Sequence, residues 1–99
     1  GGASIKLGAS GEVLGIAEGI ETALAASRKF SVPVWAAISA GLMEQWLPPD
    51  SVKTVIIFGD NDASYTGQAS AFVLAKKLRN KGLTVEVRIP ESVGMDWAD

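Results

Sequence analysis

The sequence predicts a small α/β domain of three layers, in which helices flank a central and mainly parallel four-stranded sheet. Four short runs rich in β-branched or apolar residues alternate along the chain with three segments of helical pattern. Such alternation is typical of parallel strands joined by right-handed helical crossovers. A length of 99 residues is enough for one domain with its own hydrophobic core.

Composition narrows the classes of function. The hydrophobic fraction of 47% indicates a globular chain, and no apolar run approaches the roughly 20 residues of a membrane helix. The chain has no Cys and no His, which excludes a Cys/His zinc site and a His-based triad within it. A net charge of −2 argues against a free-standing nucleic-acid binder. We expect a cytoplasmic chain without membrane contact, whose chemistry depends on carboxylates.

The first two predicted elements follow a short extension. Residues 1–12 are rich in Gly and Ser and are expected to form an N-terminal extension, with the domain proper at residues 13–99. Val13–Ala17 is predicted as a strand, and Ile20–Phe30 as a helix with basic residues in its last turn, where the helix dipole favours cations. The start without Met or a secretory signal leads us to expect a fragment of a longer protein.

The middle of the chain contains a strand, a helix and the central strand. Pro33–Ile38 is predicted as a strand, because a proline is tolerated at its first position. Ser39–Leu47 is predicted as a short helix, stopped by the two prolines that follow. From Thr54 the chain runs through β-branched and aromatic residues to Gly59, as in a strand that is buried on both faces.

The last two elements are a long helix and a strand. Thr66–Lys81 has an apolar stripe at helical spacing and a basic last turn, and Gly82 suits the position after a helix end. Thr84–Ile89 is predicted as the fourth strand, closed by Pro90. The last turns of this helix point away from the carboxyl ends of the strands, so we interpret the basic cluster as a solvated face.

Acidic residues follow three of the four strands. Glu18 follows the first strand, Asp60 and Asp62 follow the third, and the segment Glu91–Asp99 follows the fourth. The carboxyl ends of parallel strands share one edge, where α/β sheets bind ligands. If the first and third strands are neighbours, their ends lie about 5 Å apart. Three like charges there need a cation or a raised pKa to coexist.

Two interpretations of these acids stay open from the residues alone. Asp60 and Asp62 have the i, i+2 spacing from which both carboxylates can reach one Mg²⁺ ion. Alternatively, they form a polar turn or a helix N-cap, which these residue types favour. Glu18 could likewise be a charge at the helix N-terminus, although Glu21 in the first turn suits that role better. Arg88, near the end of the fourth strand, is a candidate phosphate contact.

The acidic motifs resemble those of the Toprim domain. The resemblance rests on Glu18-Gly19, on Glu21-Thr22-Ala23-Leu24-Ala25 and on Asp60-Asn61-Asp62 after a later strand. The resemblance is strongest to the Toprim domain of phage- and plasmid-type primases and primase-helicases. It lies in the sequences of Gly15–Ala26, Pro33–Ala37 and Asp96–Asp99. Gly67 resembles the glycine of the family after the Asp pair, although it lies two residues later than in cellular primases.

The resemblance implies a three-layer, Rossmann-like Toprim fold and assigns roles to the acids. Glu18 is then the catalytic glutamate, a general acid or base that also lies at the metal. Asp60 and Asp62 are the pair that binds Mg²⁺, or alternatively Mn²⁺, and no organic cofactor is implied. Asp96 and Asp99 are candidate additional acids.

The implied function is metal-dependent nucleotidyl transfer, in which a DNA primase makes RNA primers on single-stranded DNA. The partners would be the DNA template, nucleoside triphosphates, and zinc-binding or helicase modules of the same chain. Two alternatives remain. One is the Toprim domain of a nuclease or topoisomerase that cleaves DNA phosphodiesters, and the other is a non-catalytic Toprim scaffold in DNA repair or recombination.

Overall fold

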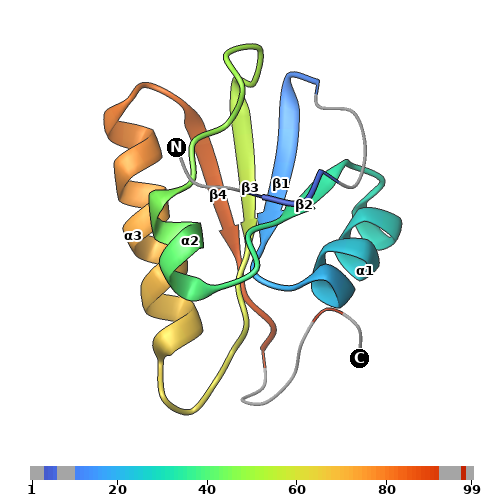
Figure 1. The fold of residues 1–99 in the computed structure, drawn as a ribbon, viewed down its shortest axis with the longest axis vertical. Helices are drawn as coiled ribbons and strands as arrows, with labels where there is room; N and C mark the ends of the chain where they lie inside the picture. The colour runs from blue at the N-terminus through green and yellow to red at the C-terminus, as the bar shows by residue number, and fades with distance from the viewer. Residues whose placement is uncertain (1–3, 7–10, 92–96, 98–99) are drawn as a thin grey trace.

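The computed structural model describes residues 4–6, 11–91 and 97 and has the predicted α/β architecture (Figure 1). Four strands form one sheet in the order β2-β1-β3-β4, and every neighbouring pair is parallel. In chain order the elements are β1 (Val13–Ala17), α1 (Ile20–Phe30), β2 (Val34–Ala36), α2 (Ala40–Gln45), β3 (Thr54–Phe58), α3 (Thr66–Asn80) and β4 (Thr84–Arg88).

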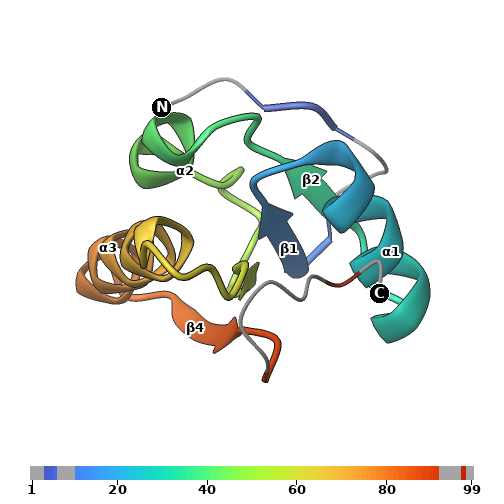
Figure 2. The same ribbon diagram turned by 90° about the horizontal axis from the view of Figure 1, so that it is seen from below.

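The first and third strands are neighbours, as the site prediction required. Their register places Ala17 opposite Phe58, so both strands end at the same level of the sheet. Figure 2 looks at the molecule from this side. The chain segments that follow Ala17 and Phe58 therefore leave the sheet next to one another.

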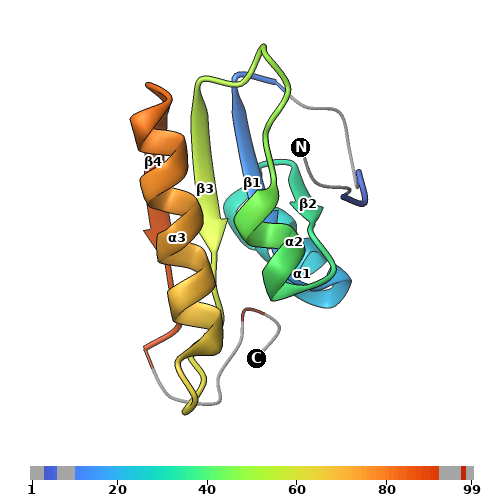
Figure 3. The ribbon, with the colours of Figure 1, turned by 60° about the vertical axis from the view of Figure 1, so that its left-hand side comes forward.

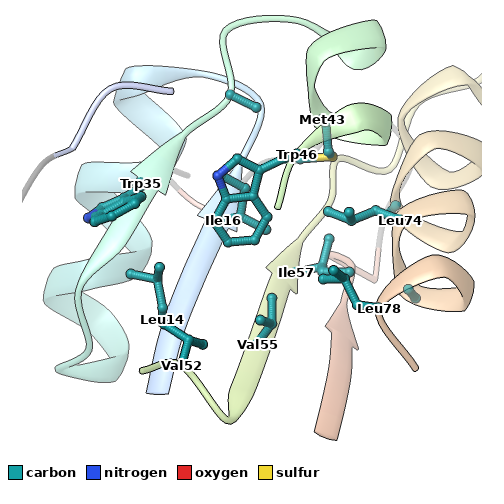
Figure 4. Close-up of a cluster of buried hydrophobic side chains, with 13 residues drawn as sticks. Leu14, Ile16, Trp35, Met43, Trp46, Val52, Val55, Ile57, Leu74 and Leu78 are labelled. Atoms are coloured by element: carbon teal, nitrogen blue, oxygen red, sulfur yellow. The ribbon is translucent and has the colours of Figure 1, made fainter. Parts of the chain in front are cut away.

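The face of the sheet under α2 and α3 carries the larger core. Figure 3 shows these two helices in front of the sheet and α1 behind it. Trp46 at the end of α2 is 1% exposed, and its ring lies over the strands among aliphatic side chains (Figure 4). This cluster consists of Leu14, Ile16, Trp35, Ala37, Met43, Trp46, Val52, Val55, Ile57, Ala71, Leu74, Ala75 and Leu78. Burial of so much apolar surface is the main stabilising contribution to a domain of this size.

The opposite face is covered by α1 and is built from small and aromatic residues. The ring of Phe58 lies 5.3 Å from that of Phe30 and 5.7 Å from that of Trp97, with edge-to-face geometry in the second pair. Gly15 allows β1, β2 and this aromatic cluster to approach closely. A Cβ at Gly15 would lie 2.8 Å from a methyl group of Val34 and 2.9 Å from the Phe58 ring.

Several elements are shorter than predicted, each for a local reason. The second strand ends at Ala36 rather than Ile38, because Ile38 has a left-handed backbone with φ of 83°. The second helix ends at Gln45 rather than Leu47, because Trp46 is already extended. Strand β4 ends at Arg88 rather than Ile89, and α3 ends at Asn80 rather than Lys81. Gly82 follows with a φ of 94°, the left-handed conformation expected of a glycine after a helix end.

The described part of the N-terminal extension lies against the sheet. Ile5 forms an antiparallel bridge with Ala36, in which each backbone N–H donates to the carbonyl of the other residue at 2.8 and 3.0 Å. This bridge pairs part of the outer edge of β2, which would otherwise expose its backbone groups. Within the described residues, none of the helices combines the length and the apolar character needed to cross a bilayer.

The basic end of α3 is less solvated than predicted. Lys77 donates a hydrogen bond of 2.7 Å from Nζ to the backbone carbonyl of Glu44 in the last turn of α2. Burial, and secondarily the charge of Lys81, lowers the pKa of Lys77. The carboxylate of Glu44 in turn accepts a hydrogen bond of 2.8 Å from Ser70. Lys77 therefore fixes α3 to α2, while Lys76, Arg79 and Lys81 are exposed as predicted.

Candidate functional site

The predicted acids Glu18, Asp60 and Asp62 lie at the carboxyl edge of the sheet. Glu18 is the residue after β1, and the Asp pair follows β3 after Gly59. Because Ala17 and Phe58 are opposite one another, the two acidic turns leave the sheet side by side. The negative charges of Asp60 and Asp62 both raise the pKa of Glu18, as expected for carboxylates that share one site.

Glu18 is a partly buried carboxyl group whose pKa is raised. The main cause is burial, which disfavours the charged form, and the repulsion by Asp60 and Asp62 adds to it. The backbone N–H of Ala40, at the start of α2, donates to the carboxylate and opposes this rise. The result is a carboxyl group with a higher proton affinity than an ordinary glutamate, which is a property of general acids and bases.

Asp62 is in the opposite electrostatic situation. Its Oδ1 atom accepts hydrogen bonds from the Ser64 hydroxyl at 2.9 Å and the Thr66 N–H at 3.1 Å. Its Oδ2 atom accepts one from the Gly67 N–H at 3.0 Å. These donors, with the Ser64 hydroxyl first, lower the pKa of Asp62 and keep the group ionised. Asp62 thus binds the N-terminus of α3 from the preceding turn, as in the polar-turn interpretation, although the N-cap residue is Tyr65.

Capping does not exhaust the capacity of this carboxylate to bind a cation. Each carboxylate oxygen offers about two lone-pair directions, so an oxygen that accepts one hydrogen bond can still bind a metal ion. The capping contacts also fix the orientation of Asp62, and a ligand with a fixed orientation loses less entropy on metal binding. Capping and metal binding are thus compatible roles for the same side chain.

Gly67 allows α3 to begin close to the Asp pair. A Cβ at this position would lie 2.9 Å from Oδ2 of Asp62 and 3.1 Å from the backbone oxygen of Asp60. Real Cβ atoms are almost never found as close as the first of these distances. A side chain at Gly67, singled out in the sequence by its resemblance to a glycine of the family, would therefore displace the Asp62 carboxylate or the Asp60 backbone.

Asn61 connects the acidic turn to the end of β4. Its amide nitrogen donates to the carbonyl of Pro90 at 2.7 Å, and its amide oxygen accepts from Gln68 of α3 at 3.0 Å. Gln68 also donates to the backbone carbonyl of Asp62 at 3.1 Å. Asn61 thus holds the backbone on which Asp60 and Asp62 are presented, and the Oδ1 atom of Asp60 is shielded from solvent.

The donor set fits a hard divalent cation that also binds substrate. Mg²⁺ prefers oxygen ligands and is commonly bound by one or two carboxylates together with substrate phosphates. Two aspartates with a fixed backbone supply such a partial set. In the described part of the chain, no three or more His, Cys, Asp or Glu side chains are grouped so that they could hold a metal ion. A metal ion bound by the Asp pair would therefore take its remaining ligands from water and substrate oxygens.

The other predicted site residues divide into two groups. Arg88 forms an ion pair of 2.9 Å between its Nε and Oε1 of Glu86, and its guanidinium lies 4.5 Å from the Phe30 ring centre. Its side chain is thus engaged on the α1 face of the sheet, and its contact with phosphate stays a prediction. Asp96 and Asp99 lie outside the described residues.

One group at this site was missed by sequence reasoning. The Ala40 N–H that contacts Glu18 is a backbone donor and has no signature in the sequence. The contacts of Ser64, Thr66 and Gly67 with Asp62 were covered by the polar-turn interpretation of the Asp pair, since Asp before Ser and Thr at a helix start favours such contacts. Tyr65 is 72% exposed and lies in the turn before α3.

Comparison with known proteins agrees with this geometry. The sequence profile of the Toprim domain matches residues 13–99. Among solved structures, the fold is similar to a DNA primase domain from Pseudomonas aeruginosa, with a TM-score of 0.60 and 16% identity. The match covers 88% of this chain but only 28% of that one, and no curated protein sequence matches. The chain belongs to the Toprim domain family.

Proposed function

We propose that the chain is the Toprim catalytic domain of a phage- or plasmid-type DNA primase, which synthesises RNA primers on single-stranded DNA. The observation that carries this proposal is the pairing of one carboxyl group of raised pKa, Glu18, with an ionised Asp62 at the same sheet edge. Environments that push the pKa values of neighbouring carboxyl groups apart are typical of sites that need both a proton carrier and a permanent charge.

Asp60 and Asp62 would hold Mg²⁺, with Mn²⁺ as an alternative, and Glu18 would lie beside it. When bound, the metal ion supplies charge neutralisation for a triphosphate and polarises the phosphoryl oxygen. Glu18 would accept or return the proton of the attacking hydroxyl, a task that suits a carboxyl group of raised pKa. Asn61 and Gly67 would keep the Asp pair in place by the contacts described above.

The remaining parts of a primase would supply template binding. The net charge of −2 lacks the basic footprint that dominates affinity for nucleic acid. The similar primase domain is a longer chain, of which this chain covers 28%. We therefore propose that the domain works in the cytoplasm as one module beside zinc-binding or helicase modules, with nucleoside triphosphates and single-stranded DNA as substrates.

A non-catalytic scaffold is the alternative that one observation favours. Both carboxylate oxygens of Asp62 already accept hydrogen bonds from the start of α3, so the residue has a structural reason to be present without metal. A nuclease or topoisomerase would use the same carboxylates for cleavage. The primase proposal and this cleavage alternative differ in product, which is a primer in one case and a broken DNA strand in the other.

The test is primer synthesis by the longest polypeptide that contains this domain, with Glu18→Gln compared to Glu21→Gln. Gln keeps the size of Glu18 and can still accept the Ala40 hydrogen bond, but it cannot carry the proton. We expect a loss of orders of magnitude, about 10²–10⁴-fold, for Glu18→Gln. Glu21, in the first turn of α1 and exposed, is the matched control and should leave the rate near normal.

Equal rates in both variants would remove the catalytic assignment of Glu18. Cleavage of DNA in place of priming, abolished by the same Glu18→Gln change, would establish the nuclease alternative. A wild-type protein that neither primes nor cleaves and does not bind Mg²⁺ would establish the scaffold.

A further inference from the structure

The turn between β2 and α2 contains a strained residue directly beside Glu18. Ile38 has a φ of 83°, which is a conformation that a β-branched residue rarely adopts. Its side chain is 49% exposed, so the strain is not offset by burial in the core. Backbone strain of this kind persists only where surrounding contacts impose it, and it is often found at functional sites.

The contacts of this turn converge on Glu18. The N–H of Ala37 donates to the carbonyl of Ala17 at 2.7 Å, and the N–H of Ile38 donates to the carbonyl of Glu18 at 2.6 Å. Two residues later, the N–H of Ala40 donates to the Glu18 carboxylate. One short turn therefore binds both the backbone and the side chain of Glu18.

The far side of the turn is fixed by the start of α2. The hydroxyl oxygen of Ser39 accepts a hydrogen bond of 3.2 Å from the N–H of Leu42, and the carbonyl of Ser39 accepts one of 3.0 Å from Met43. Met43 is 2% exposed and anchors α2 in the larger core. The Ala40 N–H is consequently held between a strained turn and a packed helix.

We propose that the backbone N–H of Ala40, aimed by the left-handed turn at Ile38, is the positioning group that keeps the Glu18 carboxylate over the acidic site. The proposal rests on the proposed function of Glu18. A glutamate side chain has several rotatable bonds, and the negative charges of Asp60 and Asp62 repel this one. Without a donor on the other side, the carboxylate would turn away from the Asp pair toward solvent.

The test removes this N–H while keeping the helix. Ala40 is the first residue of α2, a position that accepts proline because its N–H has no partner within the helix. Ser39 precedes it with φ of −146° and ψ of 163°, which is the extended conformation that a residue before proline requires. Ala40→Pro should thus delete the donor to Glu18 and leave the backbone in place.

Gly41→Ala is the matched control in the same turn of α2. A Cβ at Gly41 would meet no atom within 4 Å, and the substitution keeps every N–H. Both variants of this chain should give folded NMR spectra with near-native chemical shifts in the sheet. The side-chain couplings of Glu18 should indicate one preferred rotamer in the wild type and in Gly41→Ala. In Ala40→Pro they should instead indicate averaging among several rotamers.

The functional readout is primer synthesis by the longer polypeptide. Ala40→Pro should lower kcat roughly 10- to 100-fold and change KM little, because misplacement of a reacting group affects the chemical step. Combined with Glu18→Gln, it should cause no further loss, because it acts through Glu18. Ile38→Gly provides a second variant if the proline prevents folding. Glycine adopts the left-handed turn without strain but does not hold it rigidly. This variant should therefore also lower kcat without lowering Tm.

The results separate the two proposals. An unaffected Glu18→Gln variant would overturn the proposed function itself. A strong loss in Glu18→Gln, together with normal kcat and a single Glu18 rotamer in Ala40→Pro or Ile38→Gly, would overturn the positioning inference alone. A further loss in the double variant Ala40→Pro/Glu18→Gln would likewise show that Ala40 does not act through Glu18.

Discussion

The turn after β1 and the turn after β3 leave the same edge of the sheet, yet they treat their carboxyl groups in opposite ways. In the first turn, burial and repulsion by Asp60 and Asp62 raise the pKa of Glu18. In the second turn, hydrogen bonds from Ser64 and the start of α3 lower the pKa of Asp62. The causes differ: burial and repulsion outweigh the single opposing Ala40 N–H at Glu18, whereas the hydrogen bonds from Ser64, Thr66 and Gly67 outweigh desolvation at Asp62.

This difference shows how one sheet edge can supply two chemical capacities. A carboxylate that stays charged is suited to binding a cation, whereas a carboxyl group of raised pKa is better suited to exchanging a proton. Both groups are acids at strand ends, and the sequence alone assigns them no difference in protonation. Burial and neighbouring charges at Glu18, and the hydrogen-bond donors around Asp62, create the division.

The largest effect on stability is expected when a side chain is added at Gly67, next to the turn after β3. In Gly67→Ala, the new Cβ would meet Asp62 Oδ2 at 2.9 Å and the Asp60 backbone at 3.1 Å, so the Asp pair or the start of α3 must move. Overpacking of this kind costs about 1–3 kcal/mol in unfolding free energy. Urea denaturation of the purified chain measures the change, and Mg²⁺ affinity should fall in parallel.

Gly41→Ala is the control for that experiment. Gly41 and Gly67 are each the second residue of a helix, but the space around Gly41 is open. Replacing Gly by Ala in a helix is worth up to about 1 kcal/mol of added stability when nothing clashes. Equal stabilisation by both substitutions would contradict the close approach of α3 to the Asp pair.

A smaller effect is expected from Glu18→Gln in the isolated chain, and its sign depends on pH. The folded-state pKa of Glu18 lies above its ordinary value of 4.5, so the folded chain binds the extra proton and loses stability as pH rises through this window. Gln carries no such proton. The variant should therefore melt above the wild type near pH 7 and close to it near pH 4, in thermal unfolding followed by circular dichroism. A variant that melts well below the wild type at pH 7 would make Glu18 a structural residue.

Asp62→Asn should show the opposite pH dependence. The folded-state pKa of Asp62 lies below its ordinary value of 3.8, so its charged form stabilises the fold at neutral pH, and this contribution disappears as pH falls through the folded-state pKa. The variant should be less stable than the wild type near pH 7, and the gap should close in acid. A gap that is independent of pH would contradict the role of the Asp62 charge at α3.

The smallest effect is expected on the α1 face. Arg88→Gln removes an ion pair with Glu86 whose side chains are 31% and 51% exposed, and exposed pairs contribute about 0–1 kcal/mol. Stability should change little in urea denaturation, whereas a fall in nucleotide affinity of the longer polypeptide would support Arg88 as a phosphate contact. Unchanged affinity would assign Arg88 to its contacts with Glu86 and Phe30.

The fold could be predicted from the sequence because each strand and helix has a strong local pattern. The buried run before Asp60 and the apolar stripe after Thr66 both depend on residue type and period, which are visible without a structure. The convergence of Glu18 with the Asp pair followed from parallel topology once β1 and β3 were taken as neighbours, and their pairing is confirmed.

The details of the site depend on backbone atoms and could not be predicted in the same way. The left-handed conformation of Ile38 contradicts the preference of its residue type, and it therefore leaves no pattern in the sequence. The Ala40 N–H contacts Glu18 only because α2 begins at that residue, whereas the prediction began the helix one residue earlier. An error of one residue at a helix end leaves the predicted fold unchanged, but it changes which backbone N–H is expected to contact Glu18.

The most direct test of the account is a titration of the chain with Mg²⁺, followed by NMR of its backbone amides. We expect binding of about millimolar affinity, because the site lacks substrate phosphates to complete the metal shell. The shifts should be confined to residues 59–63 and to Glu18 and Gly19, and they should disappear in Asp60→Asn. Absence of shifts at high Mg²⁺, or shifts confined to the basic end of α3 at residues 76–81, would contradict a metal site at the carboxyl edge of the sheet.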